Sequence, residues 1–266
     1  MGLAGSGNGV GPSPPMGGQS VSESVAGPVS GPGQTEAAPV VAVVARGIRV
    51  NGPWGPVYGP VDLDIDEGGV TVLLCEAGSG RTALQMTLAG RMRPKSGTLS
   101  VFGRTRATDI FAHSALAGIG ELDNVYESVT VRDLLTEQVR WNSPWYRMVP
   151  RADEQVRRRV CGPVFGDLEM PPLDEYVGEV SELDRMLLRI AVANINTPEL
   201  LVVGNLDKVT SDEDRDVLVE RLIALGRSQT VVTSTCNELT GHDVHAQIRV
   251  ANVSRIELAG KSKGDR

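Results

Sequence analysis

Residues 70–82 read VTVLLCEAGSGRT, and this stretch decides how the chain folds. Its first five residues form a continuous apolar run, which is typical of a strand buried on both faces of a sheet. Residues 75–82 approach the phosphate-binding pattern G-x-x-x-x-G-K-[ST], with Cys75 in place of the first glycine and Arg81 in place of lysine. A buried strand, a glycine-rich loop and an amphipathic helix in this order predict a phosphate cradle.

The loop residues have the chemistry that such a cradle needs. Glycines at 78 and 80 leave room for backbone N–H groups to converge on phosphate oxygens. Arg81 keeps the positive charge of the missing lysine, but as a wider planar fork. The candidate nucleotide-binding residues of the loop are Ala77, Gly78, Ser79, Gly80, Arg81 and Thr82, with the Thr82 hydroxyl as the candidate ligand of Mg²⁺. The alternative is an ordinary strand-to-helix turn that uses glycine for tightness.

Strands and helices alternate along the rest of the chain. Apolar or alternating patterns predict strands at 40–50, 61–66, 98–102, 200–203 and 230–234, and edge strands at 247–250 and 254–258. Turn signals lie at 51–53 and 55–56. These patterns predict an α/β fold: a P-loop core with a mostly parallel sheet that is covered on both faces.

The helices have recognisable ends. The helix after the loop repeats an apolar residue every four positions, at Leu84, Leu88 and Met92, until Pro94 stops it. Another helix opens at Ser211 in capping-box fashion and ends at Gly226. The region 132–195 is mainly helical, and we place a helical subdomain at about 125–195.

Composition limits the class of protein. Residues 1–39 are mostly Gly, Ser and Pro, which predicts a disordered tail, and residues 259–266 are expected to be flexible. The balance of 26 basic and 33 acidic side chains disfavours a nucleic-acid partner. Three isolated cysteines fit a reducing, cytoplasmic setting. No signal peptide or membrane-spanning run is visible, so we expect any membrane association to come through a partner.

Several stretches occur in the order found in one family. Residues 59–103 include LAGRMRPKSGTLSVFG at 88–103, and further matching segments are SVTVRDLL at 128–135, the run 177–203, and SQTVVTST at 228–235. Together they resemble the ATP-binding cassette of ABC transporters over residues 40–258. The resemblance implies a Walker A loop at 75–82, a signature helix before a Walker B strand at 200–203, and ATP with Mg²⁺ as ligand. Its partners would be a membrane subunit, a second cassette, or both.

The catalytic motifs of that family are replaced. The family's Q-loop glutamine corresponds to Glu121, and of its signature motif only Ser181 survives, followed by Glu182. Gly204 and Asn205 stand where the family places its Mg²⁺ ligand and its catalytic base, and Cys236 replaces the switch histidine. The D-loop aspartate aligns near Ser211 or Asp212. Asp207 lies close by, but we expect the intervening turn to aim it elsewhere. No residue is therefore assigned a catalytic role.

Aromatic residues supply two further hypotheses. Trp54 lies near the place where the family stacks a ring on adenine, and it is a candidate nucleotide contact, although a tryptophan beside proline is more often a packed loop residue. Trp141, Trp145 and Tyr146 cluster in the helical region, where we favour core packing over an exposed docking patch.

The resemblance and its departures predict a degenerate ATP-binding subunit with impaired or absent hydrolysis, acting as the regulatory or structural half of a transporter or cassette pair. Two alternatives stay open. One is a nucleotide-free scaffold of the same fold that mediates protein contacts. The other is an active ATPase that uses displaced residues such as Asp207.

Overall fold

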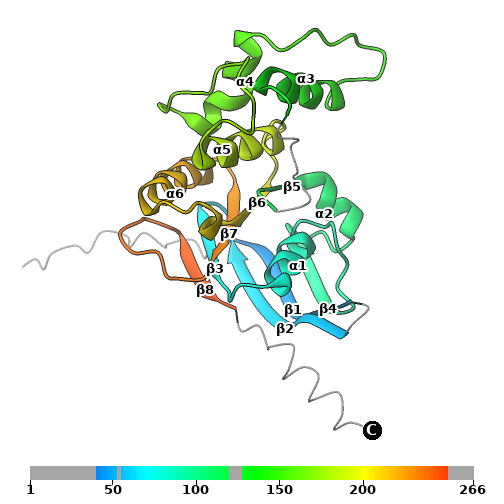
Figure 1. Cartoon of the computed structure of the whole chain (residues 1–266). Helices are drawn as coiled ribbons and strands as arrows, with labels where there is room; N and C mark the ends of the chain where they lie inside the picture. The colour runs from blue at the N-terminus through cyan, green and yellow to red at the C-terminus, as the bar shows by residue number, and fades with distance from the viewer. Residues whose placement is uncertain (1–39, 53–54, 120–127, 251–266) are drawn as a thin grey trace, which may run out of the picture. The chain divides into compact units, whose positions relative to one another are not determined.

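Two β-sheets organise the chain, as a computed structural model shows for residues 40–52, 55–119 and 128–250. A three-stranded antiparallel sheet has the order β2-β1-β4, and a five-stranded parallel sheet has the order β5-β6-β7-β3-β8 (Figure 1). The strands are β1 Val41–Gly52, β2 Gly55–Asp66, β3 Val70–Leu74, β4 Ser96–Val101, β5 Ser114–Ala117, β6 Leu200–Asn205, β7 Thr230–Thr235 and β8 Ala246–Arg249. The predicted α/β fold is confirmed.

Helices cover both faces of the parallel sheet. They are α1 Ser79–Leu88, α2 Ala107–His113, α3 Val131–Trp141, α4 Glu154–Phe165, α5 Glu182–Ala193, a 3₁₀ turn η2 Leu206–Lys208, and α6 Asp212–Gly226. Ser211 caps α6 by accepting a hydrogen bond from the backbone N–H of Asp214 at 3.3 Å, as its capping pattern predicts. Within the described residues, no helix combines the length and the apolar character needed to span a bilayer.

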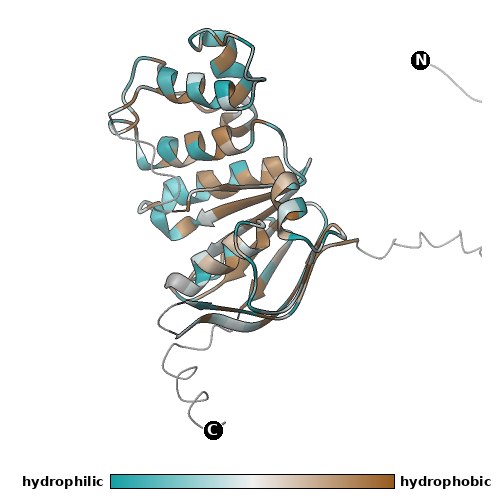
Figure 2. Cartoon of the chain, turned by 90° about the vertical axis from the view of Figure 1, so that its right-hand side faces the viewer, coloured by the Kyte–Doolittle hydropathy of each residue, from teal (hydrophilic) through white to brown (hydrophobic). Residues whose placement is uncertain are grey.

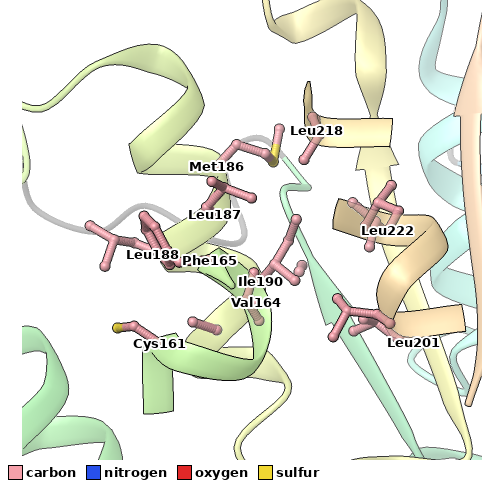
Figure 3. Close-up of a cluster of buried hydrophobic side chains, with 14 of the residues drawn as sticks. Cys161, Val164, Phe165, Met186, Leu187, Leu188, Ile190, Leu201, Leu218 and Leu222 are labelled. Atoms are coloured by element: carbon pink, nitrogen blue, oxygen red, sulfur yellow. The ribbon is translucent and has the colours of Figure 1, made fainter. Parts of the chain in front are cut away.

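Alternate residues of the parallel strands serve two separate cores. In β3, Val70, Val72 and Leu74 face a core shared with the helices α3 to α6, whereas Leu73 faces a core shared with α1 and the antiparallel sheet. Figure 3 shows part of the first core, where side chains of α4, α5 and α6 meet Leu201 of β6. The strands of the parallel sheet are correspondingly hydrophobic in Figure 2. Burial on both faces explains the continuous apolar run with which β3 begins.

The helix α1 is held firmly between the two sheets. Tyr58 of β2 is 1% exposed and donates a hydrogen bond from its hydroxyl to Thr87 Oγ1 at 2.8 Å. Burial raises the pKa of Tyr58 to about 12, so this hydroxyl keeps its proton. On its other side, α1 packs through Leu84 and Leu88 into the core that it shares with β6 and β7. The loop before α1 is therefore attached to a fixed helix.

Two sequence expectations need correction, and two elements were not predicted. The pair 55–56 was expected to turn, but β2 already begins at Gly55. The helix after the loop ends at Leu88 rather than near Met92, because Gly90 adopts φ 69° where the backbone of α2 passes close by. The sequence also gave no signal for α2 and β5. The expected strand 254–258, Trp54, Glu121 and both chain ends lie outside the described residues.

Candidate functional site

The candidate phosphate-binding loop leaves the carboxyl end of β3. The backbone N–H of Cys75 donates to the carbonyl of Thr235 at 3.0 Å, which extends the pairing of β3 with β7 by one step. Residues 76–78 are exposed, and α1 begins at Ser79. Gly78 adopts φ 154°, and a Cβ there would meet open space, so its conformation rather than crowding favours glycine.

The amino end of α1 has the donor set of an anion site. Gly78 occupies the N-cap position without a side-chain cap, and no acidic residue lies in the first turn. The first N–H groups of a helix need an acceptor, and a phosphate oxygen can supply one. Thr82 is exposed on the first turn. Residues 77–82 therefore fit the phosphates of a nucleotide.

Arg81 is already engaged. Its Nη1 donates to Asp207 Oδ2 at 3.1 Å and to Cys236 Sγ at 3.4 Å. The Arg81 side chain is only 9% exposed, so this ion pair is shielded from water on the arginine side. A phosphate that arrived at the loop would compete with Asp207 for this guanidinium.

Asp207 is held by several donors besides Arg81. The Thr235 hydroxyl donates to its Oδ1 at 2.6 Å, and the backbone N–H of Cys236 donates to its Oδ2 at 3.0 Å. Burial alone would raise the pKa of Asp207, but hydrogen bonds from Thr235, Cys236 and Arg81 outweigh it and lower that pKa. The carboxylate is therefore charged at neutral pH and is occupied by protein donors.

The expectation that the turn after β6 aims Asp207 away from the loop is wrong. Leu206, the first residue of η2, and Val209, which follows η2, are both buried, and Asp207 between them reaches back to the Thr235 hydroxyl at the end of β7. Asn205 Oδ1 accepts a hydrogen bond from the Asp207 backbone N–H at 3.0 Å and caps η2. The amide at the family's base position therefore stabilises the turn.

Gly204 leaves no room for a metal ligand. A Cβ built at this position would collide with the carbonyl group of Gly118, which follows β5. Gly118 in turn adopts φ 70°, and a Cβ built there would collide with Met186 Sδ of α5. No set of three or more His, Cys, Asp or Glu side chains is placed to share a metal ion in the described part of the chain. The residues present therefore fit the phosphates but offer Mg²⁺ little beyond the Thr82 hydroxyl.

The polar side chains of the signature segment form hydrogen bonds with other residues of this chain. Ser181 caps α5 by accepting from the Asp184 backbone N–H at 3.0 Å, and its hydroxyl donates to Asp184 Oδ2 at 2.7 Å. Glu182 Oε2 accepts from the hydroxyl and the backbone N–H of Thr210, at 2.5 Å and 3.0 Å. Hydrogen bonds from Thr210 lower the pKa of Glu182, so a negative charge remains within the signature segment.

One site residue that the sequence reasoning missed is Gln85. This side chain is 2% exposed, and its Nε2 donates to the Val203 carbonyl and to Ser234 Oγ, each at 3.0 Å. It ties α1 to the ends of β6 and β7. A polar residue next to Leu84 on an otherwise apolar helix face was the available signal.

The packing expected for the aromatic cluster is also wrong. Trp141, Trp145 and Tyr146 are exposed at 79%, 95% and 75%. They lie at the end of α3 and in the loop that follows it, beyond the core made by α4 and α5.

Comparison with known proteins identifies the family of this chain. The sequence profile of the ABC transporter family matches residues 58–207, more than half of the chain. The chain belongs to the ABC transporter family. It is 26% identical over 209 residues to mouse ATP-binding cassette sub-family A member 9, covering 75% of this chain and 12% of that protein. It is also 26% identical over 208 residues to the sulfate/thiosulfate import ATP-binding protein CysA of Mycolicibacterium paratuberculosis, covering 75% of this chain and 54% of that protein.

A solved cassette has the same fold. CbiO1 of Clostridium perfringens, described as part of the ABC transporter complex CbiONQ, superposes with a TM-score of 0.63 at 14% identity, covering 85% of this chain and 96% of that one. The chain thus spans nearly all of this cassette, but only 12% and 54% of the two curated relatives. The expected cassette fold of the ABC ATPases is confirmed.

Proposed function

We propose that this chain is a degenerate ATP-binding subunit, which binds nucleotide weakly and acts as the regulatory or structural half of a transporter or cassette pair. The observation that carries the proposal is the ion pair between Arg81 and Asp207 on the phosphate-binding loop. The loop keeps its shape and its cation, but an internal carboxylate occupies that cation. Binding of ATP must therefore replace Asp207 by phosphate, which lowers the net affinity.

Loss of hydrolysis follows from the groups around the loop. A positioned general base contributes about 10²–10⁴-fold to the rate of such a reaction, and the amide of Asn205 cannot accept a proton. Gly204 cannot bind Mg²⁺, which would otherwise neutralise the developing phosphate charge. The carboxylate of Asp207 already receives hydrogen bonds from Thr235, Cys236 and Arg81, so its lone pairs are not directed at a water molecule.

The signature segment of this chain would contribute little to the nucleotide site of a second cassette. In the family, each site combines the Walker A loop of one cassette with the signature of the other. Here the Ser181 hydroxyl is engaged by Asp184, and the charged Glu182 follows it. A partner's γ-phosphate would meet a negative charge, which is unfavourable. We propose that the partner is a membrane subunit or a related cassette, and that this partner holds the chain at the membrane.

Calorimetric titration tests nucleotide binding when ATP is added either with Mg²⁺ or with EDTA. Because position 204 offers no metal ligand, ATP in EDTA should bind about as tightly as Mg-ATP. The Arg81→Ala variant should lose affinity in both conditions. A Mg²⁺ requirement for binding would contradict the assignment of Gly204.

The alternative is a nucleotide-free scaffold, which the same ion pair favours because it satisfies Arg81 without a ligand. A ligand at ten times its Kd stabilises the folded state by about 1.4 kcal/mol, which raises Tm by roughly 3 °C in a protein of this size. No rise in Tm at millimolar ATP, with or without Mg²⁺, would favour the scaffold.

A further inference from the structure

Exposed aromatic side chains are concentrated in one short segment that starts at the end of α3. The four most exposed large hydrophobic side chains among the described residues lie within residues 141–148: Trp141 at 79%, Trp145 at 95%, Tyr146 at 75% and Met148 at 96%. We call residues 140–151 the aromatic loop. It comprises the last two residues of α3 and most of the segment that leads to α4, and this segment forms a wide arc beside these helices in Figure 1. Apolar side chains gathered at this level of exposure indicate a contact surface.

The charge of the aromatic loop is opposite to that of the whole chain. The formal net charge of the protein is −7, yet residues 138–152 contain arginines at 140, 147 and 151 and no acidic residue. Arg151 pairs with Asp133 at 3.0 Å. Arg140 and Arg147 are exposed and make no ion pair within the described part of the chain. The loop therefore offers free cations beside its aromatic rings.

The indole N–H of Trp141 donates to Glu137 Oε1 at 3.3 Å, but the two aromatic residues in the middle of the loop have polar ends that no described residue engages. Trp145 and Tyr146 pack edge to face, with ring centroids 5.9 Å apart and an interplanar angle of 85°. Neither the indole N–H of Trp145 nor the hydroxyl of Tyr146 has a hydrogen-bond partner among the described residues. Rings with a free polar end suit the boundary between hydrocarbon and headgroups, where tryptophan and tyrosine concentrate.

We propose that the aromatic loop binds directly to an anionic lipid bilayer, with Trp145, Tyr146 and Met148 in the interfacial region and Arg140 and Arg147 on lipid phosphates. Side chains that stand almost free of the protein fit a fluid surface better than a rigid protein groove. Attraction of cations to anionic headgroups supplies the charge complementarity. This contact would add to any membrane association that comes through a partner, and it does not depend on nucleotide binding.

Sedimentation of the full-length protein with phosphatidylcholine vesicles, with and without phosphatidylglycerol, tests the proposal. Binding is expected only to vesicles that contain phosphatidylglycerol, and it should weaken as salt is added. Arg147→Gln should reduce binding about five-fold, since one basic residue near an anionic surface has roughly this effect. Trp145→Ser combined with Met148→Ser should reduce it by about ten-fold or more, because two apolar side chains lose their burial in the interface.

Matched control variants exist outside the aromatic loop. Tyr176→Ser removes another exposed aromatic ring, and Arg93→Gln removes another exposed cation; neither should change binding to vesicles. All of the substituted side chains are exposed, so the variants should keep the fold, which circular dichroism checks.

Four outcomes would overturn the proposal. The wild-type protein could fail to sediment with phosphatidylglycerol vesicles at low salt. The Trp145→Ser/Met148→Ser variant could bind as well as wild type. Finally, the protein could bind only vesicles that carry a membrane protein, or bind a single-stranded oligonucleotide but no vesicles, and the aromatic loop would then serve another class of macromolecule.

Discussion

The carbonyl group of Gly118 fills the space that a side chain at Gly204 would need. The resemblance to the ABC family aligns position 204 with that family's Mg²⁺ ligand. On this alignment, the close packing between the ends of β5 and β6 leaves no space for such a ligand here. The loss therefore involves more than one side chain, because a new carboxylate at 204 must first displace a neighbouring strand end.

Restoring the family's aspartate should therefore damage the protein. We expect Gly204→Asp, and also Gly204→Ala, to lower the free energy of unfolding by about 3 kcal/mol or more, because backbone atoms cannot yield as a flexible side chain can. Urea unfolding measures the change. Gly162→Ala in α4 is the control: a Cβ there meets nothing within 4 Å, so stability should be unchanged or higher. Equal stability of Gly204→Ala and wild type would contradict the packing argument.

Release of Arg81 should improve nucleotide binding. The variant Asp207→Asn removes the competing charge, so we expect the Kd for ATP to fall by about ten-fold, the scale of a hydrogen bond to a charged group. Calorimetric titration measures this. Asp243→Asn removes an equal charge from an exposed position and should leave the Kd unchanged. Weaker binding by Asp207→Asn would mean that Asp207 supports the nucleotide site.

The Asp207 contacts should also make stability depend on pH. The pKa of Asp207 is lowered in the folded protein, so its charged form stabilises the fold above the ordinary aspartate pKa of about 4, and this contribution is lost as pH falls through the folded value. Wild type should therefore be more stable than Asp207→Asn at pH 7, and the difference should shrink in acid. A constant difference across that range would argue against a charged Asp207.

The three cysteines should differ sharply in reactivity. Burial raises the pKa of Cys75 to about 11, although nearby Arg81 acts in the opposite direction, and burial raises the pKa of Cys161 to about 12. Cys236 is exposed. Ellman's reagent at neutral pH should therefore modify one thiol rapidly in the folded protein. Cys236→Ser should abolish this phase and Cys161→Ser should preserve it; a rapid phase that survives in Cys236→Ser would show that a buried thiol is accessible.

Local patterns predicted the scaffold well, for physical reasons. The apolar runs at β3, β6 and β7 reflect burial on two faces, and the Ser211 cap acts within one turn of α6. Each of these signals depends only on residues that are close together in the sequence. Substitution of residues elsewhere, including those at the family's catalytic positions, therefore leaves them unchanged.

Contacts between distant segments could not be predicted in this way. Gly118 and Gly204 approach each other because β5 and β6 pair in parallel, and β5 itself gave no sequence signal. The direction of Asp207 depends on the buried residues Leu206 and Val209 that flank it and on donors at the end of β7. The exposure of Trp145 was mispredicted because hydrophobicity alone does not distinguish a core position from a contact surface.

The central claim is that the phosphate cradle persists while the groups that would split ATP are gone. Steady-state phosphate release with saturating Mg-ATP tests it most directly, with wild type, Arg81→Ala and Asp207→Asn prepared in parallel. We predict background release from all three proteins, even where calorimetry detects bound ATP. Turnover by the wild type that either substitution abolishes would contradict it, because the chain would then be an active ATPase with displaced catalytic residues.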